Sequence, residues 1–152
     1  MDDAEAVEMD AAAVADFLGR RGTGVLALAR DGESYAVPVS YGYDEGTGCF
    51  YLRLGFGPVS EKRRFVETTE RATLVVYGQT DDRWRSVVAR GALEPITEAD
   101  VDLALVRALR QADLPLLAIF DVDREELSFQ TYRLDPDELG GRTATADPDD
   151  WT

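Results

Sequence analysis

Three observations predict that this chain folds as a small antiparallel β-barrel, mainly β with a few helices. Five or six short segments alternate apolar and polar residues or are rich in β-branched residues. Turn-forming sequences such as Asp31-Gly32 and Glu45–Gly48 separate several of them. Helical periodicity is confined to a few stretches, so the pattern favours one sheet closed on itself over an alternating α/β architecture.

The length of 152 residues predicts a single domain spanning 1–152. We expect an ordered core at about residues 10–142. The segments 1–9 and 143–152 are expected to be flexible, because both are polar, acidic chain ends. No repeat or internal linker divides the chain.

The first third predicts one helix and a hairpin. Asp10 can cap a helix over Ala11–Arg20, which carries a modest apolar stripe. A nearly continuous apolar strand follows at Gly24–Arg30, and a return strand is expected at Tyr35–Tyr43. Pro38 cannot donate to a β-ladder, so we expect it at a sheet edge or beside something other than a strand, such as a ligand.

The stretch Cys49–Glu67 is the one around which the chain is organised. A strand is expected at Phe50–Leu54, a loop at Gly55–Pro58, and a helix capped by Ser60. The first helical turn then carries Lys62, Arg63 and Arg64, and Lys62 is the only lysine beside 15 arginines. Cations here oppose the helix dipole unless an anion binds. An ordinary solvated helix start explains the charges equally well.

The second half of the sequence predicts further strands and one helix. Strands are expected at Ala72–Gln79 and Arg83–Leu93, the latter with Trp84, Ser86, Val88 and Arg90 on one face. A helix is predicted from Thr97 to about Ala112. Leu114–Val122 is apolar, and its pattern does not distinguish a helix from a strand. A last strand is expected at Ser128–Leu134. The tail from Asp135 is acidic and rich in Pro and Gly, so we expect it to be largely irregular.

Charge and composition exclude several classes of protein. The net charge of −14 argues against nucleic acid or an anionic membrane as partner. The abundance of Asp and Glu resembles the proteins of salt-loving archaea, so we expect stability to rise with molar salt. No apolar run suggests a signal peptide or a membrane span. The single Cys49 rules out an internal disulfide and makes a cytoplasmic location the expectation.

The absence of histidine removes His-based catalytic triads and the usual zinc sites, so no metal is expected. Cys49 reads as an inert strand residue. Trp84 has two interpretations, as a core residue of a barrel strand or as a cofactor contact.

Three segments, in this order, resemble the pyridoxamine 5′-phosphate oxidase-like family of FMN-binding split barrels. They are Tyr35–Tyr41, Phe50–Arg53 with Ser60–Lys62, and Trp84–Gly91. The resemblance covers about residues 10–142. It implies a Greek-key-like split barrel that forms a homodimer with an FMN molecule in each groove between subunits.

The resemblance also implies residues that bind the cofactor. Val39, Ser40 and Tyr41 would lie along the isoalloxazine ring. Arg53 and Lys62 would hold the phosphate, with a hydroxyl from Ser60 and Arg63 close by. Trp84 and Ser86 would face the ring, from the partner subunit. Arg142 may be read either as a residue reaching this site or as an exposed tail arginine.

Two departures from the family pattern affect these expectations. Glu61 stands where relatives carry Arg or Lys, which dilutes the phosphate site. Arg133-Leu134-Asp135 stands where true pyridoxine-phosphate oxidases carry an Arg-x-His pair, and an Asp repels a substrate phosphate. Vitamin B6 phosphate oxidation is therefore disfavoured.

The leading hypothesis is an FMN-dependent oxidoreductase of this family, in its haloarchaeal type, whose small-molecule substrate and electron donor are unassigned. The catalytic residues are unknown; Tyr41 and Ser86 are the proton-carrying candidates to test. One alternative is a non-catalytic protein that binds or sequesters flavin. Another is a reductase that uses the deazaflavin F420, whose poly-acidic tail calls for a wider basic groove.

Overall fold

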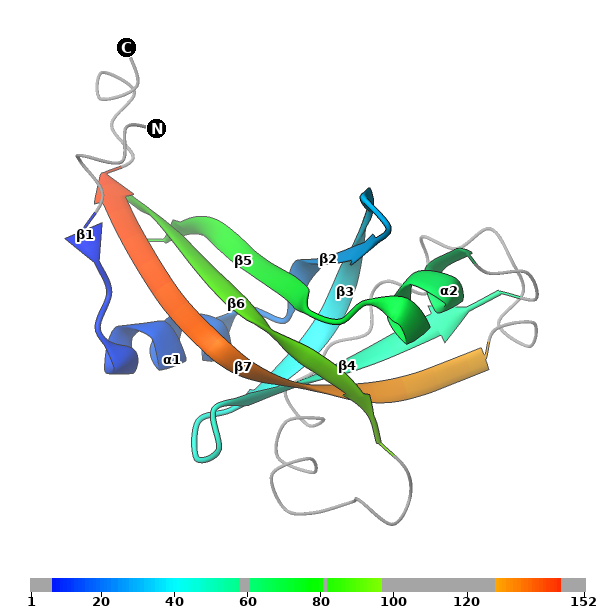
Figure 1. Cartoon of the computed structure of the whole chain (residues 1–152). Coiled ribbons are helices and arrows are strands. Elements are labelled where there is room, and N and C mark those ends of the chain that lie inside the picture. The colour runs from blue at the N-terminus through cyan, green and yellow to red at the C-terminus, as the bar shows by residue number, and fades with distance from the viewer. Residues whose placement is uncertain (1–6, 58–60, 81, 97–127, 146–152) are drawn as a thin grey trace.

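Seven strands and two helices make up the described part of the chain in this computed structural model, which covers residues 7–57, 61–80, 82–96 and 128–145 (Figure 1). The strands are β1 (Val7–Glu8), β2 (Thr23–Arg30), β3 (Glu33–Asp44), β4 (Cys49–Phe56), β5 (Ala72–Thr80), β6 (Arg83–Pro95) and β7 (Ser128–Thr145). The helices are α1 (Ala11–Arg20) and α2 (Glu61–Thr68). No helix in these ranges is long and apolar enough to cross a lipid bilayer.

The strands pair antiparallel in the order β1-β7-β4-β3-β2-β5-β6, and an additional β6–β7 pairing closes the sheet into a barrel. β7 makes this closure possible because it is 18 residues long. Its first part pairs with β4, and its later part pairs with β6 and β1. The predicted mainly β, antiparallel barrel is confirmed.

The barrel is split between β3 and β4. β3 pairs with β2 from Glu33 to Ser40 but with β4 only from Ser40 to Asp44. Pro38 therefore lies opposite Val25 of β2 and has no β4 partner. An interior strand tolerates this proline because the strand is locally an edge, as the missing donor requires.

The turns have the backbone that their sequences predict. Asp31 and Gly32 both have positive φ, at 48° and 81°, which joins β2 to β3 through a two-residue turn matched to strand twist. Gly48, with φ of 74°, ends the β3–β4 turn.

Alternate side chains fill the barrel. Val39 and Tyr41 of β3, Leu52 and Leu54 of β4, and Val87 of β6 are among the buried core residues. Helix α1 adds Val14, Phe17 and Leu18 to the same core. Asp10 caps α1 by accepting a hydrogen bond from the Ala13 N–H at 2.8 Å, as predicted.

The tail from Asp135 is not irregular, which corrects the prediction. β7 continues through this segment to Thr145 by pairing with β6. Pro136 is accommodated opposite Gly91, where the register shifts. Val7 and Glu8 also form a strand, because they pair with Thr143 and Arg142. The helix predicted at 97–112, the segment 114–122 and the predicted cap Ser60 lie outside the described residues.

Candidate functional site

A cationic corner forms where three elements meet at one end of the barrel. Figure 1 places the end of β4, helix α2 and the start of β7 together there. We use "cationic corner" for Arg53, Lys62 and Arg63 together with the rings of Phe56 and Phe129. Arg53 lies against Phe129 on the outer face of β4, and Lys62 and Arg63 lie against Phe56 at the start of α2. The hydrogen bond from Lys62 to the Gly55 carbonyl joins α2 to β4.

Lys62 is a buried lysine, with only 7% of its surface exposed. Its Nζ donates a hydrogen bond to the Gly55 carbonyl at 2.8 Å and lies 5.9 Å from the centre of the Phe56 ring. Burial lowers the pKa of Lys62 from its usual value, because removal from water disfavours the charged form. A phosphate at this corner would offset that desolvation.

Arg63, the next residue of α2, also contacts the ring of Phe56. Its Cζ is 4.3 Å from the centre of the Phe56 ring, within cation–π range. The Phe56 side chain is itself fully buried at the end of β4. The Phe56 ring therefore lies near two of the three cations of the first helical turn, Lys62 and Arg63.

Arg53 stacks on a ring from β7. Its Cζ is 5.0 Å from the centre of Phe129. Gly55 is the β4 residue directly opposite Phe129, and a Cβ on Gly55 would come within 3.1 Å of the Phe129 ring. The missing side chain at Gly55 thus leaves the space that the ring occupies. Arg53 makes no ion pair within the ranges that the structure describes.

Ser40 lies directly opposite Arg53, so both side chains are on the outer face of the β3–β4 pair. Ser40 is 1% exposed, and its Oγ finds no hydrogen-bond partner. A buried hydroxyl without a partner costs about 1–3 kcal/mol. The Ser40 hydroxyl therefore has unused hydrogen-bonding capacity at the position that pairs with Arg53.

Val39 and Tyr41 point the other way, into the barrel core. The Tyr41 hydroxyl donates to the Leu18 carbonyl at 2.7 Å, and burial raises the pKa of Tyr41 above its ordinary value. Tyr41 is therefore no proton donor for a ligand on the outer face. Any contact that these two residues make with a ligand there is restricted to their backbone.

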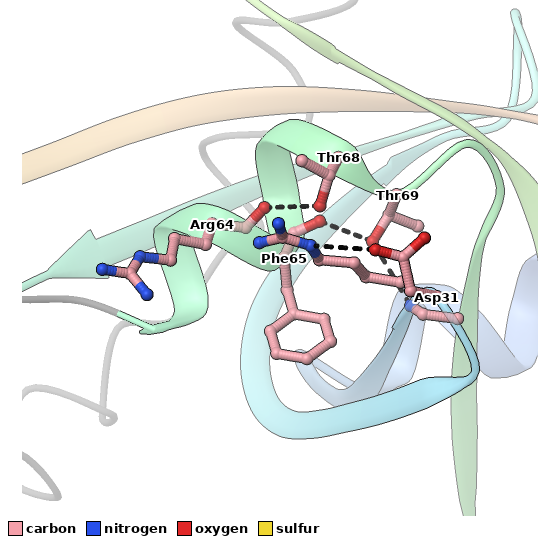
Figure 2. Close-up of polar contacts among 7 residues, drawn as sticks. Asp31, Arg64, Phe65, Thr68 and Thr69 are labelled. Carbon is pink, nitrogen blue, oxygen red and sulfur yellow. Dashed lines mark hydrogen bonds and ion pairs between the residues drawn. The ribbon is translucent and has the colours of Figure 1, made fainter.

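Helix α2 is anchored at its far end, which fixes the direction of its first turn. The Thr69 hydroxyl accepts a hydrogen bond from the Ala29 N–H of β2 at 3.3 Å (Figure 2). Phe65 stacks on Tyr35 of β3 at 5.3 Å between ring centres, so α2 packs beside the split. Arg64 is exposed and extends away from these contacts in Figure 2, and it is not part of the corner.

Trp84 and Ser86 lie at the opposite end of the barrel. Both are half-buried on the outer face of β6, so Trp84 is not a core residue. Ser86 pairs with Arg142 near the end of β7, whereas Arg53 pairs with Thr131 near its start. These eleven positions of β7 correspond to roughly 35 Å of strand. One chain does not bring the two groups of predicted residues together.

The corner includes two residues that sequence reasoning missed, Phe56 and Phe129. The alternation of the last strand does place Phe129 on the outer face with Thr131 and Arg133. A large apolar residue on an outward position was the available signal. The sequence alone does not show that Phe129 lies opposite Gly55, because this contact depends on how β4 pairs with β7.

The residues in the place of the family's substrate-phosphate pair are engaged elsewhere. Arg133 forms an ion pair with Glu94 at 3.1 Å. The Asp135 carboxylate lies 3.7 Å from the Cys49 sulfur, and burial raises the pKa of the Cys49 thiol. Within the described ranges, no group of three or more His, Cys, Asp or Glu side chains is placed to hold a metal ion.

The fold is shared with solved structures of low sequence identity. A candidate pyridoxamine 5′-phosphate oxidase from Corynebacterium glutamicum matches with a TM-score of 0.65 at 19% identity, covering 97% of this chain and 98% of the other. An FAD-binding protein from Mesorhizobium loti matches with a TM-score of 0.67 at 20% identity, over 92% and 99%. The FAD-binding protein of Mycobacterium smegmatis matches with a TM-score of 0.64 at 18% identity, over 91% and 98%. These TM-scores show a common fold, and the sequence identities are too low to show more.

No curated protein sequence matches the chain significantly. The sequence profile of the pyridoxamine 5′-phosphate oxidase family, however, matches residues 10–143, which is most of the chain and includes β2 to β6 and β7 up to Thr143. The chain therefore belongs to the pyridoxamine 5′-phosphate oxidase family.

Proposed function

We propose that this protein binds FMN in a site shared between two copies of the chain and serves as a flavin-dependent oxidoreductase. The observation that carries the proposal is the cationic corner. It is a local concentration of positive charge in a chain of net charge −14. An acidic protein needs such an island of positive charge to hold an anionic cofactor.

The corner is suited to the phosphate of FMN. Arg53 offers a planar guanidinium on the outer face, and Lys62 and Arg63 offer further donors from the first turn of α2. Ser60 precedes this turn in the sequence and would donate its hydroxyl. The Ser40 hydroxyl, buried without a partner, would bond the polar part of the cofactor nearest to Arg53.

The separation of Arg53 from Ser86 along β7 supports a homodimer, in which a second copy would supply the missing part of the site. In a two-fold dimer, the same surface of each copy meets the other, so the corner of one copy can face Trp84 and Ser86 of its partner. The outer face between these ends carries an apolar row, Pro38–Val25–Val75–Val88, on four neighbouring strands. With Tyr77, which is 59% exposed, we call this row the outer patch.

When bound, FMN would supply the hydride or electron chemistry. The chain would hold the phosphate at the corner, cover one face of the ring with the partner's Trp84, and place the Ser86 hydroxyl near the ring edge. Val39 and Tyr41 would border the ring through their backbone. Tyr41 is no longer a candidate proton carrier, because its hydroxyl donates a hydrogen bond to the Leu18 carbonyl in the core.

Two alternatives retain the fold. A flavin-sequestering protein is favoured by the small number of polar side chains around the proposed ring position. A reductase using F420 would need basic residues along its tail, and the described corner offers a compact cluster instead. FAD, the ligand named for two structural neighbours, would extend its second phosphate past the same corner.

The setting of the protein is part of the proposal. An acidic surface suits molar salt, where screening acts within a few ångströms. Described ion pairs such as Arg20–Asp16 are exposed, so salt would weaken them without much loss of stability. The single thiol, Cys49, suits a reducing cytoplasm.

The deciding experiment is the visible spectrum of the purified protein, followed by titration with FMN, FAD, riboflavin and F420. We expect a flavin spectrum and tightest binding of FMN. Steady-state NAD(P)H oxidation by the FMN-loaded protein would distinguish an oxidoreductase from a sequestering protein. Binding of F420 in preference to every flavin, or of no cofactor at all, would overturn the proposal.

A further inference from the structure

Phe129 is the one ring of the cationic corner that comes from β7, about seventy positions beyond the other corner residues in the sequence. Its ring is half-buried, unlike the fully buried Phe56, so it is not needed to fill the core. It lies on the outer face, over the Cα of Gly55 and beneath the guanidinium of Arg53. In this position the ring can restrict the direction of the Arg53 side chain.

We infer that Phe129 is a positioning residue that fixes the Arg53 guanidinium for the cofactor phosphate; this inference rests on the proposed function. An arginine on an exposed strand face normally samples many rotamers. Holding one of them costs side-chain entropy on binding. Stacking on a ring removes part of that cost before the ligand arrives and leaves the edge of the guanidinium available to donate.

The pairing of the strands explains why the arrangement is specific. Arg53 lies opposite Thr131, and Phe129 lies opposite Gly55, so Arg53 and Phe129 are diagonal neighbours across β4 and β7. A larger residue at position 55 would push the ring away, because a Cβ there would lie 3.1 Å from it. The Gly55 carbonyl also accepts the hydrogen bond from Lys62. Gly55 therefore affects the positions of both Arg53, through the Phe129 ring, and Lys62, through its carbonyl.

The test uses FMN and riboflavin, which differ only in the phosphate. Phe129→Leu keeps an apolar side chain but removes the ring. We expect it to weaken FMN binding by roughly three- to tenfold, the range of one cation–π contact, and to leave riboflavin binding unchanged. Phe129→Tyr keeps the ring and should bind FMN like the wild type. Fluorescence titration gives both dissociation constants without any turnover.

A double-mutant cycle with Arg53→Gln makes the role explicit. If Phe129 acts through Arg53, then Phe129→Leu should add nothing to the loss already caused by Arg53→Gln. Arg30→Gln, at the exposed end of β2 and paired with Asp31, controls for the loss of one positive charge. Gly55→Ala displaces the ring without removing it, and it carries the same cycle if Phe129→Leu does not fold.

The inference is overturned by unchanged FMN binding in Phe129→Leu, by an equal loss of riboflavin binding, or by losses that multiply in the cycle. If Arg53→Gln weakens FMN binding and Phe129→Leu does not, the proposed function survives and this inference alone fails. If the wild-type protein binds no flavin, or binds riboflavin as tightly as FMN, the phosphate site fails and the role of Phe129 with it.

Discussion

The cationic corner and the β6 face, which we define as Trp84, Ser86 and Arg142, differ in how they are built. The corner is preformed: Lys62 is buried, Arg53 and Arg63 lie on rings, and α2 is anchored to β2. The β6 face is half-exposed and borders the outer patch. Within the described residues, the contacts of the first region are fixed by burial and stacking, while the second region is more exposed.

This difference indicates which part of a shared site each subunit would supply. A preformed charged corner selects the ligand, because its donors lose little entropy on binding. An open face gains order only when a partner covers it. The comparison predicts that changes at the corner affect affinity for the phosphate, and that changes at the outer patch affect assembly first.

The largest effect is expected from Val75→Glu in the middle of the outer patch. A two-fold interface would bury the new carboxylate twice, and burial of an unpaired charge costs on the order of several kcal/mol. We expect monomers by light scattering and loss of flavin binding. Ala12→Glu, on the exposed surface of α1, is the matched control. A Val75→Glu protein that remains dimeric would place the interface elsewhere.

The next effect is that of Lys62→Met, which keeps an unbranched apolar side chain, one atom shorter, but removes the charge. FMN binding should weaken by at least ~1.5 kcal/mol, the lower range for a charge-assisted hydrogen bond. Riboflavin binding should be retained. Calorimetric titration of both ligands provides the comparison, with Arg30→Gln as the charge control. An unchanged FMN affinity would mean that Lys62 serves only to hold the Gly55 carbonyl.

A pH series sharpens the role of Lys62. Burial lowers its pKa from 10.5 in the folded protein, so between the lowered pKa and 10.5 the unfolded chain binds more protons. The contribution of Lys62 to the free energy of unfolding therefore rises with pH across that window. FMN affinity should fall across the same window, because the cation is lost. Lys62→Met should flatten both trends; identical pH profiles in the two proteins would contradict this role.

The smallest effect is expected from Ser40→Ala. In the free protein the hydroxyl is buried without a partner, so its removal should leave the melting temperature unchanged or slightly raised. In the complex we expect a loss of about 0.5–1.5 kcal/mol in flavin binding, the net value of one ordinary hydrogen bond. Thermal melts with and without FMN measure both. A marked drop in stability without ligand would show that Ser40 has a structural partner.

Local patterns were sufficient for most of the barrel. The alternation correctly placed Val87 and Ala89 on one face of β6 and Trp84 and Ser86 on the other, but it left open which face is the core. The Asp31-Gly32 turn and the Asp10 cap were also predicted, because each depends on residues within four positions. The cations in the first turn of α2 were identified for the same reason.

The tail could not be predicted, because its local signals oppose its structure. Pro136 and the pair Gly140-Gly141 disfavour a strand. Their conformation is set by the ladder to β6, from Arg83 to Pro95, and by the packing of Gly141 against Val14 and Met9. These contacts join residues far apart in the sequence, so no window along the chain contains them.

The sequence by itself determined the class of fold, the strand faces and the presence of a basic cluster in an acidic chain, because these follow from composition and from periods of two to four residues. Only the tertiary structure decided that Tyr41 points inward, that Ser40 meets Arg53, that Phe129 lies over Gly55, and that Ser86 lies at the other end. Pairing between distant strands fixes each of these relations. Register, unlike periodicity, is a property of two segments together.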